Sequence, residues 1–169
     1  GMLICKVLKS NRPHARILRI DTSRAEQLPG VRAVMTGKDI PDVRFGSGAV
    51  KDRRVFALDK VRYVGEPLAA VAAVDEMTAL EALDLIQIEY ADLPAVTDPI
   101  EALKPDAPLV HEDLPSYEGY AAGMGANVCT VLDSGRGEVD RAFAEADHVF
   151  EDTFRSQGIN QGYLEPMAC

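Results

Sequence analysis

The sequence predicts a fold that combines helices and strands, of the α/β or α+β class. Residues 67–74, PLAAVAAV, form an apolar run of strand length, and a strand without polar alternation is covered on both faces. Residues 76–85 then follow a helical period, and residues 86–90, IQIEY, return to a period of two. This succession predicts a packed βαβ unit.

The first 36 residues predict three strands and one helical turn. Residues 3–9, LICKVLK, alternate loosely, and residues 14–21, HARILRID, alternate more cleanly, as a half-buried strand does. Residues 31–36, VRAVMT, form the third strand. The helical turn lies between the second and third strands, where Pro29 and Gly30 end it and Asp21, Thr22 or Ser23 is its N-cap.

The next segment contains a long loop, a short strand and the βαβ unit. Residues 41–58 are mixed in character and glycine-containing, which is typical of a loop or an irregular hairpin. Residues 60–65, KVRYVG, predict a short strand with Val61 and Tyr63, and Gly65 is its turn residue. Pro67 opens the buried strand, at the position where a proline removes no essential ladder bond.

The predicted helix over 76–85 is amphipathic. Asp75 precedes it as an N-cap. Its apolar side chains recur at helical spacing and face the sheet, namely Ala79, Ala82, Leu83 and Ile86. Its acidic side chains lie off that stripe, namely Glu76, Glu81 and Asp84.

The last 80 residues predict an extended connector and a second group of elements. The proline-rich stretch over 91–128 contains one short helix, DPIEAL, with Asp98 as its cap and Pro99 at its first position. A domain boundary is expected within 104–128, where glycines cluster. Residues 137–146 predict a helix. Residues 147–154 and 161–169 predict two closing strands.

Composition and charge exclude several classes of protein. The chain has 169 residues, a formal charge of −9 and a pI near 4.8, whereas a nucleic-acid-binding protein needs a basic face. Its longest apolar run has the length of a strand, so no membrane-spanning helix is expected. Gly1 precedes a methionine, as the residue left by tag removal does, and is left out of the fold prediction.

Cysteine usage favours a reducing, cytoplasmic compartment. Three cysteines stand far apart, an odd number with no CxxC pair, namely Cys5, Cys129 and Cys169. The sequence therefore predicts neither a disulfide framework nor a zinc or iron–sulfur site within this chain.

The three histidines are interpreted as structural or exposed. His14 has no partner acid nearby in the sequence, and a general base needs one. His111 and His148 adjoin acidic residues, but neighbouring side chains on a strand diverge, so a metal site is disfavoured.

Other charged and glycine-containing segments are interpreted as surface features. Glu81 and Asp84 are neighbours on the polar face of the helix, which indicates a solvated pair. Residues 51–54, KDRR, form a solvated loop, or alternatively contact an anion or a partner subunit. GSG at 46–48 and GMG at 123–125 lack the spacing of a phosphate-binding loop.

Three polar or aromatic side chains near the end share one face of a predicted strand, namely Gln161, Tyr163 and Glu165. They either line a channel or face water, and the sequence does not decide between these alternatives.

Four motifs in order resemble the large, molybdopterin-binding subunit of molybdenum hydroxylases. The first segment matches as S-x-x-P-H-A-R-I, I-D-x-S-x-A, L-P-G-V-x-A-V and T-x-x-D-I-P, over residues 10–41. The others are residues 59–103, residues 137–154 with GEVDRAFAEADHVFEDTF, and residues 161–168 with QGYLEPMA. The family includes xanthine dehydrogenase, aldehyde oxidase, nicotinate dehydrogenase and aerobic carbon monoxide dehydrogenase.

The resemblance implies an α+β fold in three parts. Residues 2–105 would form an α/β-hammerhead domain, a mixed sheet with packed helices. Residues 106–127 would be a connector, and residues 128–169 the first strands and helix of an incomplete molybdopterin-binding domain. A preceding strand of the hammerhead domain is expected outside this sequence, so the strand over 3–9 is expected to lack a neighbour.

The resemblance also implies a redox function that depends on further chain. Complete members hydroxylate a carbon of a heterocycle or aldehyde with water and pass electrons to iron–sulfur clusters and a flavin. No catalytic, cofactor-binding or metal-binding residue of the family maps onto this sequence. The chain is therefore expected to be a structural part of such a subunit, inactive alone; the alternative is a free-standing interaction module without catalysis.

Overall fold

The computed structural model describes residues 1–46, 50–121, 125, 127–158 and 162. The chain divides into two compact units, Gly1–Val131 and Leu132–Cys169, and each is described by itself. Residues 106–127, predicted as a connector, belong to the first unit.

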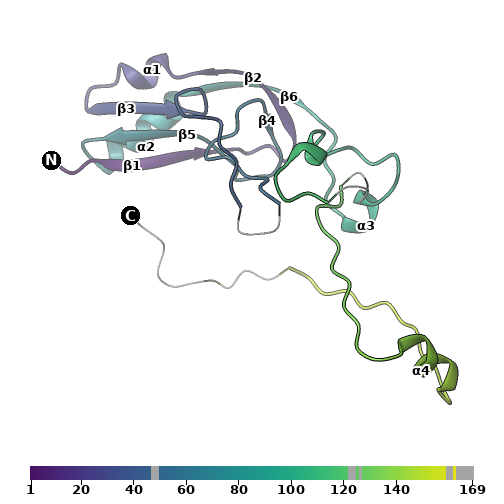
Figure 1. The fold of residues 1–169 in the computed structure, drawn as a ribbon. Helices are drawn as coiled ribbons and strands as arrows, with labels where there is room; N and C mark the ends of the chain where they lie inside the picture. The colour runs from purple at the N-terminus through teal and green to yellow at the C-terminus, as the bar shows by residue number, and fades with distance from the viewer. Residues whose placement is uncertain (47–49, 122–124, 126, 159–161, 163–169) are drawn as a thin grey trace. The chain divides into compact units, whose positions relative to one another are not determined.

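In the described part of the first unit, six strands form two sheets of three strands each (Figure 1). One sheet has the order β1-β5-β3, with β1 at Ile4–Lys9, β5 at Pro67–Ala73 and β3 at Val31–Thr36. The other has the order β4-β2-β6, with β4 at Lys60–Val61, β2 at Ala15–Asp21 and β6 at Gln87–Asp92. Every described pairing is antiparallel.

The predicted order of strand, helix and strand is confirmed, but the expected βαβ pairing within one sheet is wrong. Helix α2, Glu76–Leu85, leads from β5 in one sheet to β6 in the other. Both edges of β5 are occupied, by β1 and β3, so β6 pairs with β2 instead. The mixed sheet is accordingly replaced by two antiparallel ones. The α+β class itself is confirmed.

The strand predicted over 60–65 is shorter than expected because the chain turns. Gly65 has a φ of 94°, in the left-handed region that favours glycine. Its N–H donates to the Ser10 carbonyl at 2.8 Å, and the Ser10 N–H donates to the Glu66 carbonyl at 2.8 Å. The turn therefore holds the chain against the residues that follow β1, and β4 ends at Val61.

A bulge in β2 explains why its apolar positions are unevenly spaced. The pairing of β2 with β6 shifts register between Ile17 and Arg19. The extra residue, Leu18, is 64% exposed. Because one residue is inserted, the inward-facing position that follows Ile17 is Ile20 and not Arg19.

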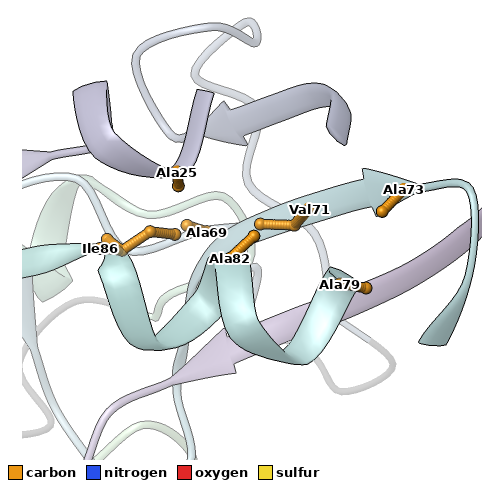
Figure 2. Close-up of a cluster of buried hydrophobic side chains, with 7 residues drawn as sticks. All are labelled: Ala25, Ala69, Val71, Ala73, Ala79, Ala82 and Ile86. Atoms are coloured by element: carbon orange, nitrogen blue, oxygen red, sulfur yellow. The ribbon is translucent and has the colours of Figure 1, made fainter. Parts of the chain in front are cut away.

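The core of the first sheet is built from small side chains. Helix α2 begins at the predicted cap, where the Asp75 carboxylate accepts from the Thr78 N–H at 2.8 Å. As predicted, its apolar stripe faces the sheet: Ala79 and Ala82 are fully buried. Figure 2 shows the cluster that they form with β5 and its surroundings, which consists of Ala25, Ala69, Val71, Ala73, Ala79, Ala82 and Ile86.

Three short helices complete the first unit. Helix α1, Ser23–Glu26, is the predicted turn, with Thr22 as its N-cap residue and the Asp21 carboxylate accepting from the Ser23 N–H. Helix α3, Pro99–Ala102, has the predicted cap, since the Asp98 side chain accepts from two backbone N–H groups. A 3-10 turn, η1, spans Leu114–Ser116.

The second unit contains helix α4, Val139–Glu145, within the predicted range 137–146. The strand predicted over 147–154 is wrong: these residues are exposed, and none of them belongs to a described strand. A strand needs a ladder partner, and sequence pattern alone supplies none. The strand predicted over 161–169 lies outside the described residues, except for Gly162.

Helices in the described ranges are all too short or too polar to cross a bilayer.

Replacing Ala82 by leucine tests whether small side chains set the distance between α2 and β5. The free energy of unfolding of the Ala82→Leu variant is expected to be about 1–3 kcal/mol lower than that of the wild type. The larger leucine side chain overpacks a filled core. Urea denaturation followed by circular dichroism measures this difference. The matched control is Glu81→Leu, which places the same side chain on the exposed face; equal losses in both variants would contradict the prediction.

Candidate functional site

A cluster of charged and aromatic side chains joins residues 109–120 to the rest of the first unit. These residues, called the strap below, include η1 and precede the second unit. The cluster takes side chains from the loop after β3, from β4 and the turn that follows it, and from the strap: Arg44, Lys60, Arg62, His111, Glu112, Asp113 and Tyr117.

Lys60 is a buried cation whose charge is balanced by the strap. Its side chain is 1% exposed, and its Nζ donates to Glu112 Oε2 at 2.7 Å and to the Leu109 carbonyl at 3.4 Å. Burial raises the pKa of the Glu112 carboxyl, but the hydrogen bond and charge of Lys60 and the charge of Arg62 outweigh it and hold that pKa below its ordinary value. Glu112 is therefore ionised beside the buried ammonium group.

Tyr117 connects His111 to Asp113. The Tyr117 hydroxyl donates to Asp113 Oδ1 at 2.6 Å, because an ionised carboxylate only accepts. Its oxygen then accepts from His111 Nδ1 at 2.9 Å, which assigns the proton of the neutral ring to Nδ1. Arg44 donates to Asp113 Oδ2 at 2.7 Å and lies over the Tyr117 ring, 3.8 Å from its centroid.

The cluster is poorly suited to acid–base catalysis near neutral pH. Burial, with the charges of Arg62, Lys60 and Arg44, lowers the pKa of His111 to about 4. Burial and the hydrogen bond to Asp113 raise the pKa of Tyr117 to about 12. An effective general acid or base has a pKa near the working pH, and both groups are moved away from it. The arrangement fits an anchor for the strap.

The other two histidines have separate surroundings. His14 is buried, as a structural histidine is, and its Nδ1 donates to the Pro94 carbonyl at 2.6 Å. Its Nε2 is buried and has no partner among the described residues. His148, in the second unit, is exposed and packs against Phe150 with ring centroids 6.4 Å apart.

The interpretation of residues 51–54 as a solvated loop is wrong for Arg54. Its side chain is mostly buried and binds the Asp42 carboxylate through two hydrogen bonds, at 2.5 and 3.0 Å. A further ion pair joins it to Asp59 at 3.5 Å. Bidentate pairing with a carboxylate 12 residues away, which sequence pattern does not reveal, accounts for the difference.

The remaining sequence-predicted positions are not brought together. Glu81 and Asp84 are exposed on α2, as predicted. Cys5 and Cys129 are exposed free thiols. In the described ranges, no three His, Cys, Asp or Glu side chains are placed to hold one metal ion. Several of these positions lie outside the described residues: 47–48, 123–124, Gln161, Tyr163, Glu165 and Cys169.

Sequence reasoning missed Lys60 and Tyr117 as cluster members. Lys60 stands in a strand pattern where a lysine is expected to reach solvent, and its burial depends on Glu112, 52 residues later. The available signal was the charged run at 111–113 between two leucines, Leu109 and Leu114.

The two partners of the buried ion pair are expected to respond unequally to substitution. Glu112→Ala should lower the free energy of unfolding by about 1–2 kcal/mol, because the Lys60 charge stays buried without its carboxylate. Lys60→Met should be close to neutral, since Glu112 is 49% exposed and water can hydrate it. Chemical denaturation measures the free energy of unfolding of both variants. A larger decrease for Lys60→Met than for Glu112→Ala would contradict the prediction.

Comparison with known proteins relates both units to the family that the sequence motifs resemble. A family described as "Aldehyde oxidase and xanthine dehydrogenase, a/b hammerhead domain" matches residues 1–94. A probable xanthine dehydrogenase subunit of Bacillus subtilis is 40% identical over 166 residues, which is 98% of this chain and 20% of that protein. The nicotinate dehydrogenase large molybdopterin subunit of Eubacterium barkeri is 37% identical over 99% of this chain and 36% of its own length.

The chain is also similar to a solved structure of a related enzyme. The Cu,Mo-CO dehydrogenase in its carbon monoxide-reduced state superposes with a TM-score of 0.73 and 35% identity, over 87% of this chain and 19% of that chain. The chain thus spans about a fifth to a third of the length of these proteins. The match to the family covers more than half of the chain, which therefore belongs to the aldehyde oxidase and xanthine dehydrogenase family, with its hammerhead domain in residues 1–94.

Proposed function

We propose that this chain is the amino-terminal structural part of a molybdenum hydroxylase large subunit. The observation that carries the proposal is the extent of the similarity. The hammerhead family accounts for residues 1–94, whereas the Bacillus subtilis relative is similar over 166 residues, which includes both units. The second unit thus accompanies the hammerhead domain within one longer relative. Residues 128–169 fit the start of a molybdopterin-binding domain that further chain completes.

The complete subunit would hydroxylate a carbon of a heterocycle or an aldehyde, with water as the source of oxygen. It would pass electrons to iron–sulfur and flavin partners in the cytoplasm. The names of the relatives support a multi-subunit redox enzyme: they include a xanthine dehydrogenase subunit, a nicotinate dehydrogenase large molybdopterin subunit and a carbon monoxide dehydrogenase large chain.

The described residues do not form a site that fits the molybdenum cofactor. They bring together no set of three metal-ligating side chains. Two cations of the polar cluster are already paired within the first unit, since Lys60 binds Glu112 and Arg44 binds Asp113. No step of the reaction is therefore assigned to a residue of this chain.

The apolar surface of the second unit supports association with further protein. Phe150 and Phe154 are 91% and 90% exposed, and Phe143 on α4 is also exposed. Exposed aromatic side chains at this density mark a surface that another protein segment covers. The remainder of the molybdopterin-binding subunit is the partner that the family relationship favours. A non-catalytic interaction module would also need such a surface, so activity has to separate the two functions.

A chimera tests the proposal directly. This chain replaces the matching 166 residues of the Bacillus subtilis relative, and the chimera is compared with the unmodified relative and with this chain alone. The expected result is a chimera that contains molybdenum by elemental analysis and that oxidises the relative's substrate with a dye as acceptor. The isolated chain is expected to do neither, because the proposal places the cofactor site in the part of the subunit that lies outside this chain.

Two outcomes would count against the proposal. A folded chimera without molybdenum would mean that this chain cannot serve as the corresponding part of such a subunit. Turnover or stoichiometric molybdenum in the isolated chain would mean that it holds a complete site.

A further inference from the structure

We propose that the strap is a pH-sensitive latch, bound to the rest of the first unit while His111 is neutral and released as one segment when His111 gains a proton. The inference concerns the first unit alone and does not depend on the proposed redox function.

The strap can detach from the rest of the first unit without breaking a strand pairing in either sheet. None of the described strand pairings involves residues 109–120. Its apolar anchorage is one small cluster, in which Leu114 and Tyr117 pack on Val50 with Tyr120 at the margin. Its described backbone contact with the loop after β3 is the Lys51 N–H, which donates to the Glu118 carbonyl at 3.0 Å. Release therefore exposes little apolar area and leaves the core of α2 and β5 intact.

Ion pairs also connect the strap to the rest of the first unit. Lys60 binds Glu112 at 2.7 Å, Arg44 binds Asp113 at 2.7 Å, and Arg16 lies 3.9 Å from Glu112. The charged groups around His111 come from three parts of the chain: Arg44 and Asp52 in the loop after β3, Lys60 and Arg62 at β4, and Glu112 and Asp113 in the strap. The three cations lower the pKa of His111, and Asp52 raises it.

A second proton on His111 is disfavoured while the strap is bound. Nδ1 already donates to Tyr117, so the new proton goes to Nε2 and makes the half-buried ring a cation. That cation adds to the charges of Arg44, Lys60 and Arg62. In the released strap the ring is hydrated and its pKa returns to about 6.5, whereas burial and these cations hold it at about 4 in the bound strap.

The sign of the pH effect follows from these two values. Between pH 6.5 and about 4 the released strap binds one more proton than the bound strap, so binding weakens as the pH falls. Above pH 6.5 the stabilisation is fully present. Burial raises the pKa values of Glu112 and Asp113, but hydrogen bonds and nearby cations outweigh it and hold both below their ordinary range. These carboxylates therefore stay ionised through most of the window.

Hydrogen exchange on the whole chain measures strap release separately from unfolding. Two amides report on the strap, because the Val110 N–H donates to Asn127 Oδ1 and the Lys51 N–H donates to the Glu118 carbonyl. The Ala79 N–H in α2 reports on the core. After correction for intrinsic exchange rates, the opening constant of the strap amides is expected to rise by up to about tenfold per pH unit from pH 6.5 towards 4. The Ala79 amide is expected to keep its protection.

The matched control is His111→Gln, which retains an N–H donor for Tyr117 but does not titrate. Its strap amides are expected to open with no pH dependence between pH 6.5 and about 5, above the range in which the Glu112 and Asp113 carboxylates of a released strap gain protons. An NMR titration of the His111 ring in the wild-type chain gives a second measurement that needs no variant, with an expected midpoint well below 6.5.

Three results would overturn the latch. One is a wild-type strap whose opening constant does not change with pH. Another is loss of protection at Ala79 in parallel with the strap, which would indicate unfolding of the whole unit. The third is a His111 midpoint near 6.5, because an unshifted histidine binds its proton equally well in both states.

Discussion

The close approach of α2 to β5 is the constraint on which the rest of the first unit depends. Alanines form most of this contact, so the helix backbone lies near the strand backbone. Because α2 also links the two sheets, its position fixes where β6 begins relative to β5. A core made of small side chains buries little apolar surface area per residue. Its stability therefore depends on dense packing without voids.

A second, smaller core has a different physical character. Around the strap, three buried apolar side chains, Val50, Leu114 and Tyr117, are accompanied by a buried ammonium group and a chain of hydrogen bonds. Apolar contacts there are few, so electrostatic terms form a larger share of the binding energy. Such terms respond to pH and are screened by salt, whereas burial of alanine and valine involves no group that titrates. The first unit therefore combines a core that is insensitive to pH with a margin that is sensitive to it.

Local elements were predictable from sequence to a greater extent than their pairing. The period of two gave β1, β2, β3 and β6, the apolar run gave β5, and the spacing of Ala79, Ala82 and Ile86 gave α2 with its cap at Asp75. Sequence pattern did not reveal that β6 pairs with β2, because partner choice depends on which strand edges are free in three dimensions. The bulge at Leu18 was not predicted, because residues 14–21 were interpreted as a cleanly alternating strand. The polar cluster was less predictable still, since Lys60 and Glu112 lie 52 residues apart and Arg54 binds the distant Asp42.

The topology has a consequence for how the chain acquires its structure. In the described sheets β1 pairs with β5, β3 with β5, and β2 with β4 and β6, so no two strands that are consecutive along the chain pair with each other. These sheets therefore offer no β-hairpin as a fast local nucleus, and loop closure has to precede every ladder. On a translating ribosome, β1 and β3 wait until β5 is synthesised, and β2 has only the two-residue strand β4 as a partner until β6 follows. During that interval their unpaired edges are open to other chains, so pairing between partly synthesised copies competes with folding.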